Sequence, residues 1–140
     1  MTLERIRIVL VNTTHPGNIG GVARAMANMG LNHLYLVGPQ RFPSTEATVR
    51  AAGADHLLER AIVCESLDDA VADCGLVVGT TARQRSVGSV ELPPNAVMGK
   101  VRERISTDQI AFVFGREASG LTNSELERCQ YHVRDRKSVV

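Results

Sequence analysis

The sequence predicts a single α/β domain with a mainly parallel sheet and flanking helices. Its 140 residues make one domain by length, and that length is enough to bury a hydrophobic core. Strand-length apolar runs alternate with helical patterns along the chain, an order typical of βαβ units. Most of these runs are apolar throughout, and such strands need cover on both faces of the sheet.

The predicted strands are short runs rich in Val, Ile and Leu. They cover residues 5–11, 33–39, 61–65, 76–83, 110–115 and 130–134. Residues 84–94 predict a loop. Ligands of parallel sheets bind beyond the carboxyl ends of the strands. A site is therefore expected in the loops at residues 15–20, 39–42, 80–85 and 115–121.

The predicted helices are marked by the residues at their amino ends. Pro16 suits the first turn of a helix, because its missing N–H has no partner to lose there. Ser66 with Asp69, and Thr122 with Glu125, have the three-residue spacing of capping boxes. Helices are expected over residues 15–30, 44–52, 66–74, 95–105 and 121–129.

The helix over residues 15–30 carries one cation, Arg24, on a side that has few bulky groups. Its larger apolar residues recur at three- and four-residue spacing and share one face: Ile19, Val22, Met26 and Met29. Arg24 lies opposite, and Gly20, Gly21 and Asn28 fall on its side. Two interpretations stay open: tight helix packing beside a solvated arginine, or the close approach of a ligand whose charge Arg24 meets.

Charge and composition exclude several classes of functional site. The formal net charge is +1, so any nucleic-acid role depends on how the charges are placed. Three Phe, two Tyr and no Trp argue against a platform on which bases stack. Cys64, Cys74 and Cys129 form no metal-binding spacing, which predicts free thiols in a reducing cytosol and no metal. No apolar run approaches the roughly 20 residues of a membrane span, so a cytoplasmic protein is expected.

Two familiar phosphate-binding patterns fail in the glycine-rich segment. A G-x-G-x-x-G fingerprint from Gly17 would need glycine where Ile19 and Val22 stand, and the G-K-[ST] of the Walker form is absent. An unrelated nucleotide-binding module is therefore disfavoured.

A strand that ends in Gly79, Thr80 and Thr81 is followed by Arg83 and Arg85. Small hydroxyl residues suit contact with a ligand, and the two arginines suit phosphate groups. The alternative is a solvated basic loop.

A second charged loop follows the strand over residues 110–115. Gly115 and Gly120 flank Arg116 and Glu117, an arrangement that suits a loop wrapped around a small ligand. The alternative is a structural turn with a surface ion pair.

Taken in order, the segments LVNTTHPGNIGGVARAMANMG, VVGTTAR and FGREASGLTNSEL resemble the motifs of the SPOUT (SpoU–TrmD) class of RNA methyltransferases. The likeness is strongest to bacterial tRNA cytidine/uridine 2′-O-ribose methyltransferases that act on the anticodon loop. It runs from about Arg5 to Val133. The resemblance implies a parallel α/β fold with a deep trefoil knot, S-adenosylmethionine as cofactor, tRNA as substrate and a homodimer.

The resemblance also assigns roles to single residues. Asn18 and Arg24 match the catalytic positions, where Arg24 either assists deprotonation of the ribose hydroxyl or stabilises the developing alkoxide. The positions implied for the cofactor are Thr80, Thr81, Ala82, Gly115, Glu117 and Gly120. Those implied for RNA are Arg24, Arg83, Arg85 and Arg116.

The chain departs from this class after the strand that reads YHV. The class continues with an S-L-N-L-A motif that opens its last helix, whereas residues 134–140 read RDRKSVV. We therefore expect one SPOUT-type domain over residues 1–140, without the last motif and without a C-terminal extension. The alternative function is a truncated or non-catalytic RNA-binding version of the fold.

Overall fold

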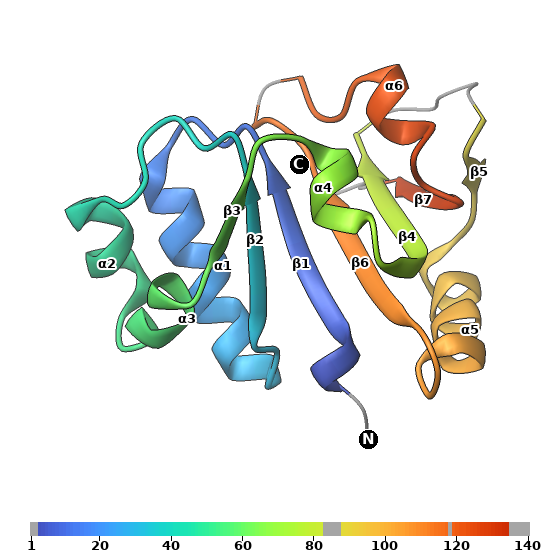
Figure 1. Cartoon of the computed structure of the whole chain (residues 1–140), viewed down its shortest axis with the longest axis horizontal. Helices are drawn as coiled ribbons and strands as arrows, with labels where there is room; N and C mark the ends of the chain where they lie inside the picture. The colour runs from blue at the N-terminus through green and yellow to red at the C-terminus, as the bar shows by residue number, and fades with distance from the viewer. Residues whose placement is uncertain (1–2, 83–87, 118, 135–140) are drawn as a thin grey trace.

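One parallel sheet organises the residues that the structure describes, namely 3–82, 88–117 and 119–134. In this computed structural model seven strands lie in the order β3-β2-β1-β6-β4-β7-β5, and their carboxyl ends share one edge (Figure 1). The strands are β1 (Ile6–Val11), β2 (His33–Val37), β3 (Ile62–Cys64), β4 (Cys74–Thr81), β5 (Val90–Glu91), β6 (Gln109–Phe114) and β7 (Tyr131–Arg134).

Helices pack on both faces of this sheet. A 3-10 turn, Leu3–Arg5, leads into β1. One face holds α1 (Pro16–Met29), α2 (Thr45–Ala51), α3 (Asp55–Glu59) and α5 (Pro94–Arg104). The other face holds α4 (Leu67–Val71) and α6 (Asn123–Leu126).

Strand β1, next to the central strand β6, shows how the sequence produces this architecture. Ile6, Ile8 and Leu10 belong to the core under α1, whereas Val9 and Val11 belong to the core under α4. All six residues of β1 are buried, and its five apolar residues are divided between the two faces, as strands covered on both sides require. The predicted α/β class is confirmed, and every pairing among the described strands is parallel.

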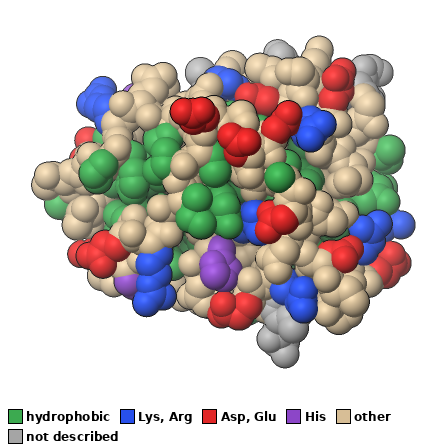
Figure 2. All heavy atoms as spheres, in the orientation of Figure 1, with side chains coloured by type: hydrophobic (Ala, Val, Ile, Leu, Met, Phe, Trp, Pro, Cys, Tyr) green, Lys and Arg blue, Asp and Glu red, His purple; other side chains and the backbone are tan. Residues whose placement is uncertain are grey.

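Helical cover of the second face is incomplete. In the part of the chain that the structure describes, no helix lies over the edge strand β3 on that side (Figure 1), and hydrophobic side chains are open to solvent there (Figure 2). Ile62 pairs in register with Tyr35 and keeps 48% of its surface exposed. The sheet is therefore sandwiched between two helical layers only over its central strands.

The structure departs from the predicted elements in three places. Helix α3 was not predicted, and β5 lies inside residues 84–94, where a loop was expected. A five-residue helix and a two-residue strand are too short to show a hydrophobic period. The capping box of Thr122 and Glu125 opens α6 as predicted, but α6 has only four residues before the chain turns toward β7.

Helix α1 packs differently from its predicted apolar stripe. Met29, on the predicted apolar stripe, is 60% exposed, whereas Gly20, on the side of Arg24, is buried. At Gly20 the structure shows the tight helix packing that was one of the two interpretations left open. The reason is α2, which crosses α1 closely: a Cβ added at Gly20 would stand 2.2 Å from the carbonyl oxygen of Ala47. Gly21 has no neighbour within 4 Å of such a Cβ and keeps the open side that was predicted for it.

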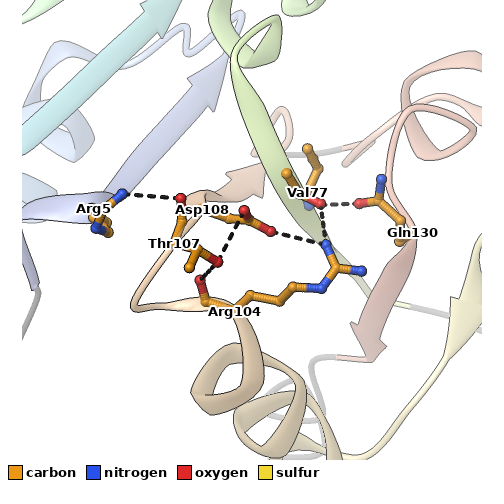
Figure 3. Close-up of polar contacts among 7 residues, drawn as sticks. Arg5, Val77, Arg104, Thr107, Asp108 and Gln130 are labelled. Atoms are coloured by element: carbon orange, nitrogen blue, oxygen red, sulfur yellow. Dashed lines mark hydrogen bonds and ion pairs between the residues drawn. The ribbon is translucent and has the colours of Figure 1, made fainter.

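Polar contacts hold the turn after α5 at the amino edge of the sheet, opposite the predicted site (Figure 3). Arg104 donates to the carbonyl of Gly75 at 2.8 Å and to Asp108 at 3.2 Å. Arg5 donates to the carbonyl of Thr107 at 3.2 Å. These contacts join α5, β4 and the 3-10 turn before β1 around the start of β6. They fix the position of the strand that leads to the second charged loop.

Candidate functional site

Two predicted loops meet at the carboxyl edge because β1 and β6 are neighbours in the sheet. The first-motif loop, residues 12–15, follows β1 and leads into α1, and the second-motif loop, residues 115–122, follows β6. Glu117 joins them: its carboxylate accepts from the backbone N–H groups of Thr14 (3.3 Å) and His15 (3.2 Å). It also accepts from the Thr14 hydroxyl at 3.1 Å and from the Asn18 amide at 3.0 Å.

The bonds from the Asn18 amide and from the backbone set the ionisation of Glu117. Partial burial by itself would raise its pKa, but the bonds from Asn18 and from the backbone outweigh that effect and lower the pKa to about 2. The carboxylate therefore stays charged at neutral pH. It lies at the amino end of α1, where the helix dipole favours negative charge.

The two predicted catalytic residues lie on α1 in different settings. Asn18 occupies the first turn, and its amide is held by Glu117. Arg24 is exposed further along the helix, and no hydrogen bond or ion pair joins it to another residue that the structure describes. Asn18 is thus positioned by the second-motif loop, and Arg24 presents a free guanidinium to solvent.

Arg116 points away from Glu117, toward α6. It makes two parallel hydrogen bonds to Glu125, at 2.9 and 3.0 Å, and a third to the carbonyl of Gly120 at 3.3 Å. With the Asn12 amide oriented to donate to β2, the Asn12 oxygen also accepts from Arg116 at 2.7 Å. The guanidinium is thus committed to internal partners, and the RNA contact implied for Arg116 stays a prediction.

Contacts within the second-motif loop explain why it contains glycine at positions 115 and 120. The backbone groups of Arg116 and Gly120 bond to each other, at 3.2 and 2.9 Å, and close the loop. A Cβ at Gly115 would stand 2.2 Å from the carbonyl carbon of Gly120, and Gly120 itself has φ of 70°. Gly115 is needed because the backbone of the same loop approaches it closely, and the ligand contact expected for Gly115 stays a prediction.

The residues after β4 are only partly described. Thr80 donates to the carbonyl of Val113 at 3.4 Å. Thr81 is 4% exposed, and its buried hydroxyl has no hydrogen-bond partner among the described residues. Ala82 is exposed at the bend that follows. Arg83 and Arg85, which were predicted to bind RNA, lie outside the described residues.

A cavity of about 740 Å³ opens at the carboxyl ends of β4, β6 and β7. Its walls are mostly apolar, and three polar side chains interrupt them. The lining residues are Thr80, Glu91, Leu92, Pro93, Pro94, Phe114, Val133 and Arg134. Its volume, and its mostly apolar lining with a few polar groups, are typical of a small-molecule site.

The cysteines take no part in this site. Cys64, Cys74 and Cys129 are free thiols, as predicted. Burial raises the pKa of Cys74 to about 11 and that of Cys129 to about 12, so both stay protonated at neutral pH. Among the described residues no group of three His, Cys, Asp or Glu could hold a metal ion. In the same part of the chain, no helix has the length and apolarity to cross a membrane.

Comparison with known proteins identifies the family. The sequence profile of the SpoU rRNA methylase family matches residues 5–134. The chain belongs to the SpoU family. Over 132 residues it is 51% identical to the tRNA (cytidine/uridine/adenosine-2′-O-)-methyltransferase TrmJ of Pseudomonas aeruginosa, covering 94% of this chain and 51% of that protein. It is 50% identical to the tRNA (cytidine/uridine-2′-O-)-methyltransferase TrmJ of Citrobacter koseri, covering 94% and 54%.

Solved structures agree with this SpoU assignment. A probable methylase family protein from Haemophilus influenzae Rd KW20 superposes with a TM-score of 0.87 at 46% identity, covering 94% of this chain and 55% of that chain. TrmJ from Z. mobilis ZM4 superposes with a TM-score of 0.86 at 34% identity, covering 91% and 57%. The predicted class is confirmed, and the chain spans about half the length of the curated relatives it matches.

The cavity of this SpoU domain fits the cofactor that the resemblance implies. Apolar walls suit an adenine ring, and polar groups suit the hydroxyl and charged groups of the rest of the molecule. The unpartnered Thr81 hydroxyl beside this edge is a spare hydrogen-bonding group. Thr80 lines the cavity directly, whereas Gly115, Glu117 and Gly120 shape the loop next to it.

Sequence reasoning missed several walls of this cavity. Glu91 and the proline pair at the start of α5 lie in the predicted loop, and the sequence predicts only a strand at Phe114 and at Arg134. The adjacent prolines that open α5 were the available signal, because proline favours the first helical turn. Phe114 and Arg134 could not be assigned to the same cavity as these prolines without knowing the order of the strands.

Proposed function

We propose that this chain is the catalytic domain of an S-adenosylmethionine-dependent 2′-O-ribose methyltransferase that acts on tRNA, on cytidine or uridine of the anticodon loop. The observation that carries the proposal is the 51% identity to a curated tRNA 2′-O-methyltransferase across 94% of the chain. The free Arg24, the anchored Asn18 and the cavity at the strand ends support it. The same relatives favour catalysis over a non-catalytic RNA-binding role.

The cavity at the ends of β4, β6 and β7 is the proposed cofactor site. When bound, S-adenosylmethionine supplies a sulfonium methyl group that the ribose 2′-oxygen attacks, while the carbon–sulfur bond breaks and its electron pair goes to sulfur. Thr80 and the bend at Ala82 border the cofactor in this proposal. Phe114 and Val133 shield it from water, which strengthens the electrostatic contacts inside the site.

Arg24 binds the substrate in this proposal. A guanidinium keeps its proton in proteins, so it serves better as a donor than as a base. Its planar fork suits two oxygens at once, a phosphate oxygen of the RNA and the 2′-oxygen as that atom gains negative charge. Arg24 then lowers the cost of the alkoxide, and the hydroxyl proton passes to solvent or to phosphate.

Asn18 and Glu117 prepare the first-motif loop for this substrate. Glu117 fixes the Asn18 amide through Nδ2, and the Asn18 Oδ1, which has no partner among the described residues, can accept a hydrogen bond. An acceptor at this place suits a ribose hydroxyl. Glu117 thereby acts through Asn18 and does not need to touch the cofactor.

The proposal also covers the oligomeric state, the chain topology and the cellular location. We infer a homodimer, the trefoil knot of the class and a cytoplasmic location, where tRNA is modified. The family match and the structural likeness to TrmJ support these assignments.

Transfer of a labelled methyl group from S-adenosylmethionine to bulk tRNA tests the activity, with nucleoside analysis to locate the 2′-O-methyl group. Arg24→Ala is expected to lower the rate at least roughly 100-fold, the usual cost of a lost oxyanion donor. Arg24→Lys should recover little, because it keeps the charge and loses the fork.

Arg102→Ala, an exposed arginine on α5, is the matched control and should keep the wild-type rate. No transfer by the unaltered protein would refute the enzyme proposal. Wild-type transfer by Arg24→Ala would refute the role of Arg24 alone.

A further inference from the structure

Three ionisable side chains gather on one wall of the cavity. Glu91 lies on β5 and pairs in register with His132 on β7, so their side chains project to the same side of the sheet. Arg134, two residues after His132, projects to that side too. Glu91 and Arg134 line the cavity, and His132 is fully buried behind them.

The two nitrogens nearest to Glu91 have no hydrogen-bond partner. Nε2 of His132 lies 3.6 Å from one carboxylate oxygen, and Nε of Arg134 lies 3.5 Å from the other. Both nitrogens are buried and unsatisfied among the described residues. A buried donor without a partner is costly, and a small movement of the Glu91 carboxylate would satisfy both.

The contact with Ser89 bears on which nitrogen of the His132 ring carries the proton. Its hydroxyl lies 2.9 Å from Nδ1 of His132, and both residues are buried. If the hydroxyl donates to Nδ1, a neutral ring carries its proton on Nε2 and directs it at Glu91. The opposite tautomer would set a ring lone pair against a carboxylate oxygen, which repels. The first arrangement is therefore favoured.

The Glu91 carboxylate is thus close to two buried donors on β7 and also lines the cavity. A carboxylate has about four acceptor positions, so even if His132 and Arg134 each take one, two remain for a ligand. Among the described residues, every other lining residue except Thr80 is apolar. Glu91 is the acidic group of this cavity, and it can accept hydrogen bonds from a ligand there.

We propose that Glu91 is a cofactor-recognition carboxylate, and that His132 and Arg134 position it to accept hydrogen bonds from S-adenosylmethionine. The proposal rests on the proposed function, since it names a residue for that same site. Two parts of the cofactor share the required chemistry, the α-ammonium group and the ribose hydroxyls. An acidic side chain on a ribose hydroxyl is a recurrent way to hold a nucleoside.

Calorimetric titration of Glu91→Gln tests the proposal, with Glu103→Gln, an exposed residue of α5, as the matched control. Loss of a hydrogen bond to a charged group should weaken S-adenosylmethionine binding by roughly tenfold or more. A second titration uses 5′-methylthioadenosine, which has the ribose and lacks the ammonium group. An equal loss with both probes places the contact on the ribose, and a loss with the first alone places it on the ammonium.

Ser89→Ala tests the positioning step. It should weaken binding in the wild-type background and have no further effect in Glu91→Gln, because both changes act through one carboxylate. A purely structural link between β5 and β7 would instead lower stability in urea and leave affinity unchanged, which would overturn the proposal. Failure of the unaltered protein to bind S-adenosylmethionine would overturn the proposed function itself.

Discussion

Replacement of Glu117 by Gln should destabilise the protein through the first-motif loop. The carboxylate accepts four hydrogen bonds from Thr14, His15 and Asn18, and a Gln amide would turn an N–H₂ group toward those donors. The lowered pKa, about 2 against an ordinary value of 4.5, sets an upper limit of about 3 kcal/mol on the contribution of the charge. Glu117 is exposed, so solvent screening reduces this to about 1 kcal/mol.

The pH dependence identifies the cause. Because the folded-state pKa lies below the unfolded value, the contribution is fully present above about pH 4.5 and disappears as the pH falls toward 2. Urea unfolding of wild type and Glu117→Gln should therefore differ by about 1 kcal/mol at pH 7, and the difference should shrink steadily below pH 4.5. Glu103→Gln is the exposed control. A difference that stayed constant from pH 7 to pH 2.5 would refute the electrostatic explanation.

Two further predictions concern glycines. Gly20→Ala should lower the free energy of unfolding by about 1–3 kcal/mol, because its Cβ would meet the Ala47 carbonyl. Gly21→Ala, next to it and facing open space, should instead raise stability by about 0.5–1 kcal/mol, since alanine is the better helix former. Equal effects at both positions in urea unfolding would contradict the packing of α2 on α1. Gly115→Ala should cost about 1–3 kcal/mol and weaken cofactor binding, because the Gly120 backbone leaves no room for a Cβ. Unchanged unfolding and calorimetry would show that this loop adapts.

Local patterns in the sequence were enough for the fold class, most element positions and the capping of α6. The same helical period placed Gly20 on the side of Arg24, but it could not show that α2 would cover that side. Contacts between distant residues were equally out of reach. The bond from Asn18 to Glu117 spans 99 residues, and it depends on β1 and β6 lying side by side. The wall at Glu91 depends on a two-residue strand that has no hydrophobic period.

The adjacent charges of Arg116 and Glu117 suggested a surface ion pair or a ligand loop, and the structure gives them separate partners. Arg116 holds the second-motif loop to α6 through Glu125, while Glu117 holds the same loop to α1 through Asn18. The loop is thereby fixed between two helices on opposite faces of the sheet. Loss of activity in a Glu117 variant would not by itself make Glu117 a cofactor ligand, because the variant also releases Asn18. Cofactor affinity separates the two roles: a ligand that is lost weakens binding directly, whereas a released Asn18 lowers transfer while the cofactor still binds.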